Sequence, residues 1–270
     1  MPHLLAVWPQ IHRRIQKTDR VFLLLDYDGT LAPIVDRPDL ASLPQETKDA
    51  LVDLSTRPPT GPIFLVGIIS ARSLEDVSTR VGIDGLIYAG NHGLEIRGPD
   101  LEFLHPEASK IKYSLDQAYR RLKEELADYP GAFAEHKGLS LTVHYRLVDD
   151  ARVKAVKDTV EKTTLPFLEN GELVISSGKM ALEIRPNISW DKGNAISTIR
   201  AALTSKSKSG GDLVLYFGDD LPDEAGFATV QETGGLGIFV GSPRYSTCAH
   251  YRLDSTQEVG QILQLIQRGL

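Results

Sequence analysis

Cysteine is almost absent from this chain of 270 residues, since Cys248 is the only one. A single cysteine cannot form a disulfide within the chain, and it excludes a metal site built from several thiolates. Long apolar runs are absent as well, because none approaches the roughly 20 residues that a membrane span needs. Residues 1–17 contain Pro9 and several charges instead of the apolar core of a signal peptide. We therefore expect a cytoplasmic protein that does not contact a membrane.

An excess of basic residues is also missing. The chain has 30 Lys and Arg against 36 Asp and Glu, a formal net charge of −6 at pH 7, and no long basic run. Proteins that bind nucleic acids neutralise phosphates with clustered positive charge, so this composition excludes a general nucleic-acid binder. A chain of this length can form one or two domains with an ample core, and we expect a monomer that acts on a small molecule.

The most informative segment of the sequence is residues 21–30, in which five apolar residues are followed by Asp-Tyr-Asp-Gly-Thr. The apolar run predicts a buried strand of a parallel sheet, with a turn at Gly29. Ligands of open α/β sheets bind at the carboxyl ends of strands, where Asp26 and Asp28 fall. One carboxylate could attack phosphorus while the other transfers a proton, with Mg²⁺ between them. Acidic residues that merely cap a strand are the alternative, but the whole D-x-D-G-T string is rarer and resembles the nucleophile motif of haloacid dehalogenase phosphatases.

A second apolar run, residues 63–69, ends at Ser70, and Arg72 follows. A hydroxyl and a backbone N–H group at a turn from strand to helix are suited to binding a phosphoryl oxygen. Ser70 as an ordinary helix N-cap is equally compatible with the sequence, and one residue can serve both purposes. The segment therefore supplies a candidate phosphate loop.

Lys192 lies in the first turn of an expected helix whose apolar positions are 196, 199 and 203. A lysine there is usually a solvated charge, and it opposes the helix dipole. This unfavourable interaction is relieved if the lysine faces a phosphate and a nucleophilic carboxylate. We therefore interpret Lys192 as a candidate phosphate ligand.

A third apolar run, residues 213–217, leads to Asp219 and Asp220, with Asp223 and Glu224 shortly after them. Carboxylates crowded at one strand end repel each other, and a divalent cation removes that repulsion. Each of the four signals is weak alone. Together, in this order, they predict a Mg²⁺-dependent phosphoryl-transfer site.

The organisation of the chain is predicted as a core with an insertion. Residues 1–107 and 187–270 alternate strands with helices and predict one α/β domain, a doubly wound Rossmann-like haloacid dehalogenase core. Residues 108–186 contain two amphipathic helices and alternating strands at 139–146 and 179–185, which predict an inserted α+β cap domain. Closure of such a cap would exclude water and complete the substrate site.

The polar face of the expected cap sheet carries acids, bases and a histidine. For any one of these residues, a solvated strand position is the simpler interpretation. A sugar, however, is recognised by such a mixture, since carboxylates accept from hydroxyls while lysine and arginine donate to them. The residues are Glu135, Lys137, His144, Arg146, Lys179 and Glu183.

Five further strings carry a more specific resemblance. They are residues 90–95, 135–137, 144–146, 178–183 and 218–224. With the D-x-D-G-T motif they resemble the trehalose-6-phosphate phosphatase family of the haloacid dehalogenase superfamily, from about residue 21 to about residue 240. The resemblance implies that Asp26 is the nucleophile, forming an aspartyl-phosphate, and that Asp28 is the general acid and base. It also implies that Ser70 and Lys192 hold the phosphoryl group.

The resemblance further implies a metal site and a sugar site. Mg²⁺ would be bound by Asp26, the backbone carbonyl of Asp28, and Asp219, with Asp220 and Asp223 in support. Asn91 and His92 would lie near the sugar without a catalytic role. The implied substrate-binding residues are Arg72, Asn91, His92, Glu135, Lys137, Arg146, Lys179 and Glu183.

Two positions depart from the family pattern. Ala71 replaces a usual glycine, which matters only if a positive φ is required there. Pro222 replaces a usual threonine and removes an N–H group. The resemblance implies a phosphatase that releases trehalose and inorganic phosphate from trehalose 6-phosphate. The alternatives are a phosphatase for glucosylglycerol phosphate, sucrose phosphate or mannosyl-phosphoglycerate, a phosphomutase, or a catalytically silent sugar-phosphate sensor.

Overall fold

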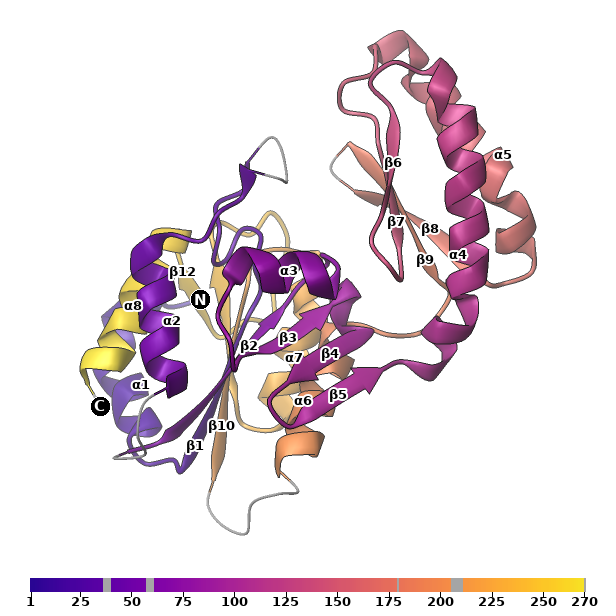
Figure 1. Ribbon diagram of the computed structural model, residues 1–270. Coiled ribbons are helices and arrows are strands. Elements are labelled where there is room, and N and C mark those ends of the chain that lie inside the picture. Colours follow the sequence, from indigo (N-terminus) through magenta and orange to yellow (C-terminus); the bar gives the residue numbers. More distant parts are fainter. Residues whose placement is uncertain (36–39, 57–60, 179, 205–210, 270) are drawn as a thin grey trace. The chain divides into compact units, whose positions relative to one another are not determined.

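The apolar run at residues 21–25 forms strand β1 (Arg20–Leu25), which is buried along its whole length. It lies inside an eight-stranded sheet with the order β12-β11-β10-β1-β2-β3-β4-β5 (Figure 1). Strands β12 to β3 in this order are parallel, and β4 is antiparallel to β3. The other strands are β2 (Ile63–Ile69), β3 (Ile87–Gly90), β4 (Glu95–Gly98), β5 (Leu101–Leu104), β10 (Asp212–Gly218), β11 (Leu236–Val240) and β12 (Tyr251–Leu253).

The structure, a computed structural model, describes residues 1–35, 40–56, 61–178, 180–204 and 211–269. It divides into two compact units, Met1–Phe103 with Trp190–Leu270, and Leu104–Ser189. We call these the core unit and the cap unit. None of the helices within the described ranges is both long enough and apolar enough to cross a membrane.

Both faces of the core sheet are covered by helices. Val21, Leu23 and Leu25 belong to the apolar cluster on one face, whereas Phe22 and Leu24 belong to the cluster on the other. The first cluster includes residues of α1 (Trp8–Ile15), α2 (Gln45–Thr56), α3 (Leu74–Val81) and α8 (Thr256–Arg268). The second includes residues of α6 (Lys192–Thr204) and α7 (Glu224–Glu232). Alternate residues of β1 therefore face different helix layers, which confirms the doubly wound α/β core.

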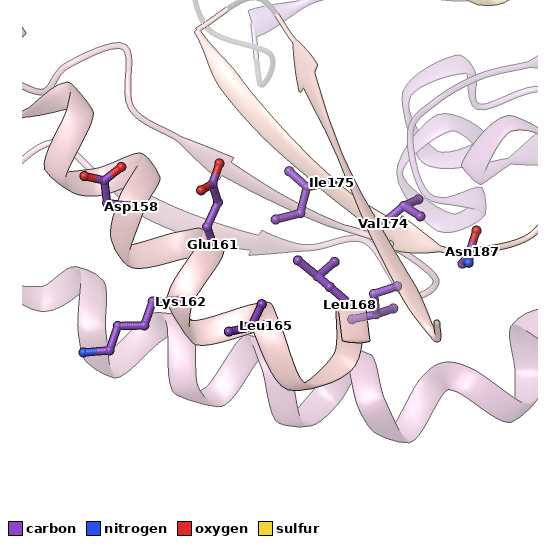
Figure 2. Close-up of a pocket in the computed structure, with 9 residues that line it drawn as sticks. Asp158, Glu161, Lys162, Leu165, Leu168, Val174, Ile175 and Asn187 are labelled. Carbon is purple, nitrogen blue, oxygen red and sulfur yellow. The ribbon is translucent and has the colours of Figure 1, made fainter. Parts of the chain in front are cut away.

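The cap unit is a four-stranded antiparallel sheet with two long helices. The sheet has the order β6-β7-β9-β8. Leu141 and Val143 of β7 pack with residues of both helices, so one sheet face forms the core of this unit. The elements are α4 (Pro106–Glu125), β6 (Phe133–His136), β7 (Leu141–His144), α5 (Asp150–Glu169), β8 (Leu173–Gly178) and β9 (Ala181–Pro186). Figure 2 shows α5 beside β8, the strand at one edge of the sheet.

Four short 3-10 helices complete the described elements. They are η1 (Leu4–Val7), η3 (Asn91–Gly93), η4 (Leu126–Asp128) and η5 (Leu221–Asp223). Of these, η3 directly follows β3, and η5 begins shortly after β10, so both follow strands of the core sheet. They therefore shape the loops at the edge where ligands bind in open α/β sheets.

Candidate active site

Three neighbouring strands of the core sheet end in residues predicted for the site. Asp26 follows β1, Ser70 follows β2 and Asp219 follows β10. The carboxyl ends of these parallel strands share one sheet edge, and the Asp26 N–H group donates a hydrogen bond to the Phe217 carbonyl at 2.9 Å. The carboxylates of Asp26, Asp219 and Asp223 offer oxygens that all lie within 4.8 Å of one another. The sheet thus brings together acidic residues that are almost 200 positions apart in the sequence.

Lys192 begins α6 and is buried between two of these carboxylates. Its Nζ lies 2.7 Å from Asp26 Oδ1 and 2.7 Å from Asp223 Oδ1. Burial lowers the pKa of Lys192, but the charges of Asp223 and Asp26 raise it by more, so the amine is held protonated. The lysine in a first helical turn is therefore compensated by two carboxylates rather than by solvent.

The Asp26 carboxyl lies in an environment that disfavours its negative charge. Burial raises the pKa of Asp26 well above its usual range, and the charges of Asp223 and Asp219 raise it further, while Lys192 lowers it by less than these effects combined. An additional cation at this position would favour the ionised form that a nucleophile requires.

Asp223 has a larger structural role than the sequence indicates. It is 1% exposed, and besides Lys192 it accepts hydrogen bonds from the Tyr216 hydroxyl at 2.5 Å and from the backbone N–H groups of Asp219 and Asp220 at 3.0 and 3.1 Å. Burial and the charge of Asp223 raise the pKa of Tyr216 well above its usual range, so the phenol remains a donor. Tyr216 was not predicted for the site. A tyrosine in an otherwise apolar buried strand, whose hydroxyl needs a partner, is the signal that could have found it.

Asp28 is bound by an arginine. Arg72 Nε and Nη2 donate to the two Asp28 carboxylate oxygens at 2.6 and 2.7 Å, and Nη1 donates to Asp76 at 2.7 Å. The Arg72 guanidinium also lies over the Tyr27 ring, 5.5 Å from its centroid. The structure therefore places Arg72, predicted to bind substrate, on the predicted general acid. A bidentate pair of this kind fixes the orientation of the carboxylate.

The loops that follow β2 and β3 are bonded to each other. The His92 N–H group donates to the Ser70 carbonyl at 2.9 Å, and the Asn91 N–H group donates to the Arg72 carbonyl at 2.7 Å. The Asn91 side chain donates to Glu95 Oε1 at 2.8 Å. Asn91 and His92 have φ angles of 49° and 58°, a conformation that non-glycine residues rarely adopt and that is often found at functional sites. The substrate-binding roles of both residues stay predictions.

Gly29 is required by a close approach. Its φ is +92°, and a Cβ atom at this position would lie 2.1 Å from Asp219 Oδ2. The turn after the nucleophile motif can therefore pass beside the acidic cluster only without a side chain. The glycine of the D-x-D-G-T string thus leaves room for the Asp219 carboxylate beside the turn.

The donor set of the acidic cluster suits a divalent cation. Asp26, Asp219 and Asp223 supply carboxylate oxygens, which Mg²⁺ and Ca²⁺ prefer. Burial, with the charges of the neighbouring Asp223 and Asp219, raises the pKa of Asp26, and a cation at this cluster would oppose that shift. The side chains of Asp28 and Asp220, two of the four predicted metal residues, are not in this group. The described residues therefore hold a cluster that could bind a metal, and the identity of the ligands stays a prediction.

The two departures from the family pattern fit the local backbone. Ala71 is not among the described non-glycine residues with a positive φ, so its methyl group causes no backbone strain. Pro222 lies in the first positions of η5, where Asp220 forms a capping box. A proline is tolerated there because the first N–H groups of a helix have no partner within it.

The cap unit aligns three polar residues across its sheet. Thr142 of β7 is paired with Glu135 of β6 on one side and with Glu183 of β9 on the other. His144 Nε2 lies 2.8 Å from Glu135 Oε2. Thr142 was not among the predicted substrate-binding residues, although its alternation with Leu141 and Val143 predicts that it lies on the polar face.

The remaining cap residues are described in part. Lys137 follows β6 and Arg146 follows β7 shortly after its end, and both make interactions within the chain. Lys179 lies outside the described residues. Arg185 is two positions after Glu183 on β9 and therefore shares its face. The sugar-binding role of the set stays a prediction.

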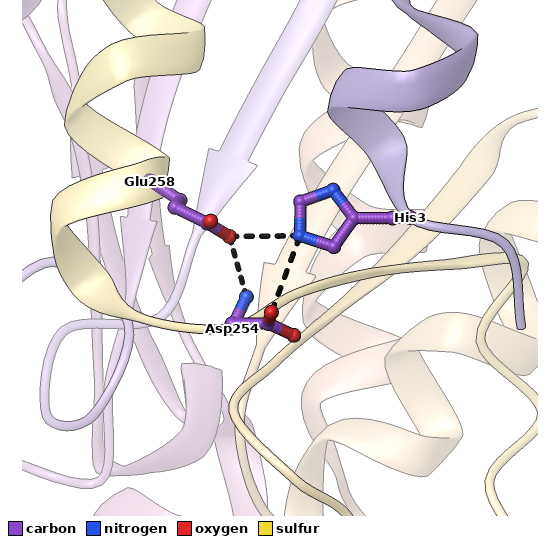
Figure 3. Close-up of side chains that lie close together, drawn as sticks. All are labelled: His3, Asp254 and Glu258. Atoms are coloured by element: carbon purple, nitrogen blue, oxygen red, sulfur yellow. Dashed lines mark hydrogen bonds and ion pairs between the residues drawn. The ribbon is translucent and has the colours of Figure 1, made fainter.

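The described residues contain a second group with metal-ligand atoms, which includes Asp254 directly after β12, the edge strand of the core sheet. His3 Nε2 lies 3.1 Å from Glu258 Oε2 and 3.6 Å from Asp254 Oδ2 (Figure 3). Glu258 also accepts from the Asp254 N–H group at 2.6 Å, and the Ser255 hydroxyl accepts from the Glu258 N–H group at 3.4 Å. These contacts are a cap at the start of α8 that also ties down the N-terminal segment.

A family model and sequence relatives show the family of this chain, and solved structures share its fold. The family model described as trehalose-phosphatase matches residues 24–257. The chain is 33% identical to trehalose-phosphate phosphatase B of Arabidopsis thaliana over 259 residues, which are 92% of this chain and 66% of that protein. Among solved structures, the C-terminal domain of C. albicans trehalose-6-phosphate phosphatase has a TM-score of 0.79 at 23% identity, covering 100% of this chain and 99% of that one. A haloacid dehalogenase-like hydrolase from Bacteroides thetaiotaomicron has a TM-score of 0.61 at 15% identity, covering 93% and 100%.

Proposed function

The chain belongs to the trehalose-phosphatase family, and we propose that it hydrolyses trehalose 6-phosphate to trehalose and inorganic phosphate. The observation that carries the proposal is the buried Lys192 held 2.7 Å from both Asp26 and Asp223 at the end of β1. A fixed ammonium beside a carboxylate nucleophile is suited to binding a transferring phosphoryl group. A structural ion pair would not need the further acidic residue, Asp219, at the same place.

We assign the chemical steps to the two aspartates of the D-x-D-G-T motif. An Asp26 carboxylate oxygen attacks phosphorus, and the bond from phosphorus to the sugar oxygen breaks. Asp28 gives its proton to the leaving sugar oxygen, and then takes a proton from the water that attacks the aspartyl-phosphate. Arg72 orients the ionised form of Asp28, which is the form that takes the proton from water, through its two hydrogen bonds. Ser70 and Lys192 hold the oxygens of the phosphoryl group.

We propose Mg²⁺ as the cofactor, held by Asp26 and Asp219 with the backbone carbonyl of Asp28, while Asp220 and Asp223 support the site. The Asp26, Asp219 and Asp223 carboxylates fit such an ion by their oxygen donors and their separation. When bound, it supplies positive charge that stabilises the phosphoryl oxygens and the ionised nucleophile.

We propose that the cap unit recognises the sugar. Mixed acids and bases suit the hydroxyl groups of a disaccharide, and the aligned Glu135, Thr142 and Glu183 support this assignment. Lys137, Arg146 and Lys179 complete the proposed set, with Asn91 and His92 of the core unit. The same set could serve another glycosyl phosphate, because small changes in a polar pocket shift the preference strongly. We further propose that the enzyme is cytoplasmic and monomeric.

The test is phosphate release with Mg²⁺ from trehalose 6-phosphate, sucrose phosphate, glucosylglycerol phosphate and mannosyl-phosphoglycerate. The Asp26→Asn protein is the control for contaminating phosphatases. A strong preference for trehalose 6-phosphate supports the proposal, and preference for another member of the panel replaces its substrate. Isomerised sugar phosphate without phosphate release would indicate a mutase, and saturable binding without turnover would indicate a sensor.

A further inference from the structure

A phenylalanine lies exposed on the polar face of the cap sheet. Phe133 is the first residue of β6, and it is 53% exposed. Side chains alternate along a strand, so Phe133 shares a face with Glu135, and Lys137 directly after the strand continues the same alternation. Ala134, between Phe133 and Glu135, packs instead against the apolar core of the cap unit. An aromatic group, an acid and a base therefore follow one another along one edge of the polar face.

The exposed phenylalanine ring is held in place by a histidine. His144 of β7 is the residue paired with Phe133 across the two strands. The two rings stack with their centroids 4.7 Å apart and their planes 21° apart. His144 Nε2 also lies 2.8 Å from Glu135 Oε2, so one side chain contacts both the aromatic ring and the carboxylate beside it. Groups that are already oriented lose less side-chain freedom when a ligand binds, which favours affinity.

A hydroxyl on the same face has no partner among the described residues. Thr142 of β7 is paired with Glu135 on one side and with Glu183 on the other. It is 6% exposed, and its Oγ1 makes no hydrogen bond within the part of the chain that the structure describes. Buried hydroxyl groups are normally bonded, so this one is suited to a group that comes from outside the chain. Both neighbours of Thr142 belong to the proposed sugar-binding set.

A glucose ring has two kinds of surface, and this edge of the sheet carries a partner for each. The hydroxyl groups project from the rim of the sugar ring, whereas its faces carry C–H groups that are apolar. The face of an aromatic ring is apolar and bears the negative part of the ring quadrupole, so it suits C–H groups. Carboxylates accept hydrogen bonds from hydroxyls, and lysine donates to them. Ligand sites commonly combine aromatic surface with a few polar groups in this way.

We propose that Phe133 is a further substrate-binding residue, and that the C–H face of one glucose ring of the substrate packs against its aromatic ring. Glu135 and Lys137 bond the hydroxyl groups on the rim of that sugar, and Thr142 Oγ1 bonds a hydroxyl that reaches the middle of the sheet. His144 is a positioning residue, because it fixes both the Phe133 ring and the Glu135 carboxylate. The inference rests on the proposed function, since it states how the same sugar is held.

The first test compares kcat and KM for trehalose 6-phosphate and for a small aryl phosphate, using the full-length protein with Mg²⁺. Phe133→Ala should raise KM for trehalose 6-phosphate by about tenfold and leave kcat nearly unchanged, because a contact made equally in the ground state and the transition state affects binding alone. Phe133→Tyr keeps the aromatic face and should hold KM within about twofold of the unaltered protein. Neither variant should change hydrolysis of the aryl phosphate, which has no sugar.

The second test measures binding without turnover. The Asp26→Asn, Phe133→Trp double variant places an indole at the proposed contact, and the Asp26→Asn protein, with only the two native tryptophans, gives the background. Titration with trehalose 6-phosphate should give a saturable fluorescence change in the double variant beyond that background. Absence of any additional change would overturn the proposal.

The matched control is Tyr113→Ala, since Tyr113 of α4 is an aromatic residue of the cap unit that is 72% exposed and lies outside the sheet. Its KM should equal that of the unaltered protein. An equal rise of KM in Tyr113→Ala and Phe133→Ala, or an equal loss on both substrates, would overturn the proposal. A lowered unfolding temperature of Phe133→Ala with unchanged KM would also overturn it, because Phe133 would then only stabilise the sheet as a cross-strand partner.

Failure of the proposed function and failure of this inference appear in different proteins. If the proposed function is wrong, the unaltered protein does not release phosphate from trehalose 6-phosphate. If this inference is wrong, the unaltered protein does so, and the Phe133→Ala protein matches its KM. The fluorescence titration decides the sugar contact in either case, because it does not depend on turnover.

Discussion

The core unit and the cap unit hold their polar side chains in opposite ways. At the end of β1, Asp26, Lys192 and Asp223 are 6%, 3% and 1% exposed, and Lys192 donates hydrogen bonds to both carboxylates. On the cap sheet, the Glu135 and His144 side chains are 44% and 21% exposed while they contact each other. Buried charges act strongly because water does not screen them, whereas exposed pairs contribute little. We therefore expect the catalytic rate to depend on the buried charges of the core unit, and the choice of substrate to depend on the exposed polar residues of the cap unit.

The strongest test of this comparison removes the nucleophile. Asp26→Asn should lower phosphate release on the order of 10³-fold or more, because the amide oxygen is a poor nucleophile. The fold should persist, since Lys192 keeps its contact with Asp223. Phosphate release and thermal unfolding measure the two effects. Substantial residual activity would show that another residue attacks phosphorus.

The next largest effect should come from the buried cation. Lys192→Met leaves Asp26 and Asp223 buried without their common partner, which should cost about 3–5 kcal/mol of unfolding free energy. Phosphate release should fall by at least about 10²-fold. Urea unfolding in the absence of divalent ions gives the stability. A variant as stable as the unaltered protein would contradict the idea that the core site is a dry, mutually paired cluster.

Removal of divalent cations tests the acidic cluster. Chelation with EDTA should lower phosphate release by at least about 10²-fold, and added Mg²⁺ should restore it. Far-ultraviolet circular dichroism should not change, because the cluster is already held by Lys192 and Tyr216. Activity that is indifferent to chelation would remove the metal role from Asp219.

A smaller and more selective effect is expected from the cap. Glu183→Ala should slow hydrolysis of trehalose 6-phosphate by about tenfold or more, through the loss of hydrogen bonds to the sugar, and leave hydrolysis of a small aryl phosphate nearly unchanged. Glu169→Ala, at the exposed end of α5, is the matched control. Equal losses on both substrates would place Glu183 outside the sugar site. They would also contradict the expectation that the cap unit sets substrate selectivity while the core unit carries out catalysis.

The smallest effect should come from Asp76, at the margin of the core site. Burial raises the pKa of Asp76, but hydrogen bonds from Arg80 and Arg72 lower it by more, so the net pKa lies below the ordinary aspartate value. The stability that this group contributes is therefore present above pH about 3.9 and lost as the pH falls through the lowered pKa. The side chain is 37% exposed, so Asp76→Asn should cost about 1 kcal/mol or less at neutral pH.

Thermal unfolding of Asp76→Asn and the unaltered protein at neutral pH and near pH 3 checks this expectation. The difference in Tm between the two proteins should shrink on acidification. A difference that grows at low pH would show that Asp76 acts through something other than its charge.

The core architecture and the place of the site were predictable because they rest on short-range patterns. Apolar runs that end in Asp26, Ser70 and Asp219 show where three buried strands stop, and parallel strands must stop at one edge. The contact of Arg72 with Asp28 was not predictable. It depends on where a side chain of one loop reaches another loop 44 positions earlier, and no local pattern encodes that distance.

The sequence by itself determined which apolar runs form buried strands, that helices alternate with them and which acidic residues stand at strand ends, because periodicity and turn residues are local properties. Only the tertiary structure decided that Asp223 is the centre of the cluster and that Tyr216 donates to it. Those features arise because packing brings together segments that are far apart in the chain. A buried charged or polar side chain then bonds to whichever group lies near it, since burying it without a partner is costly.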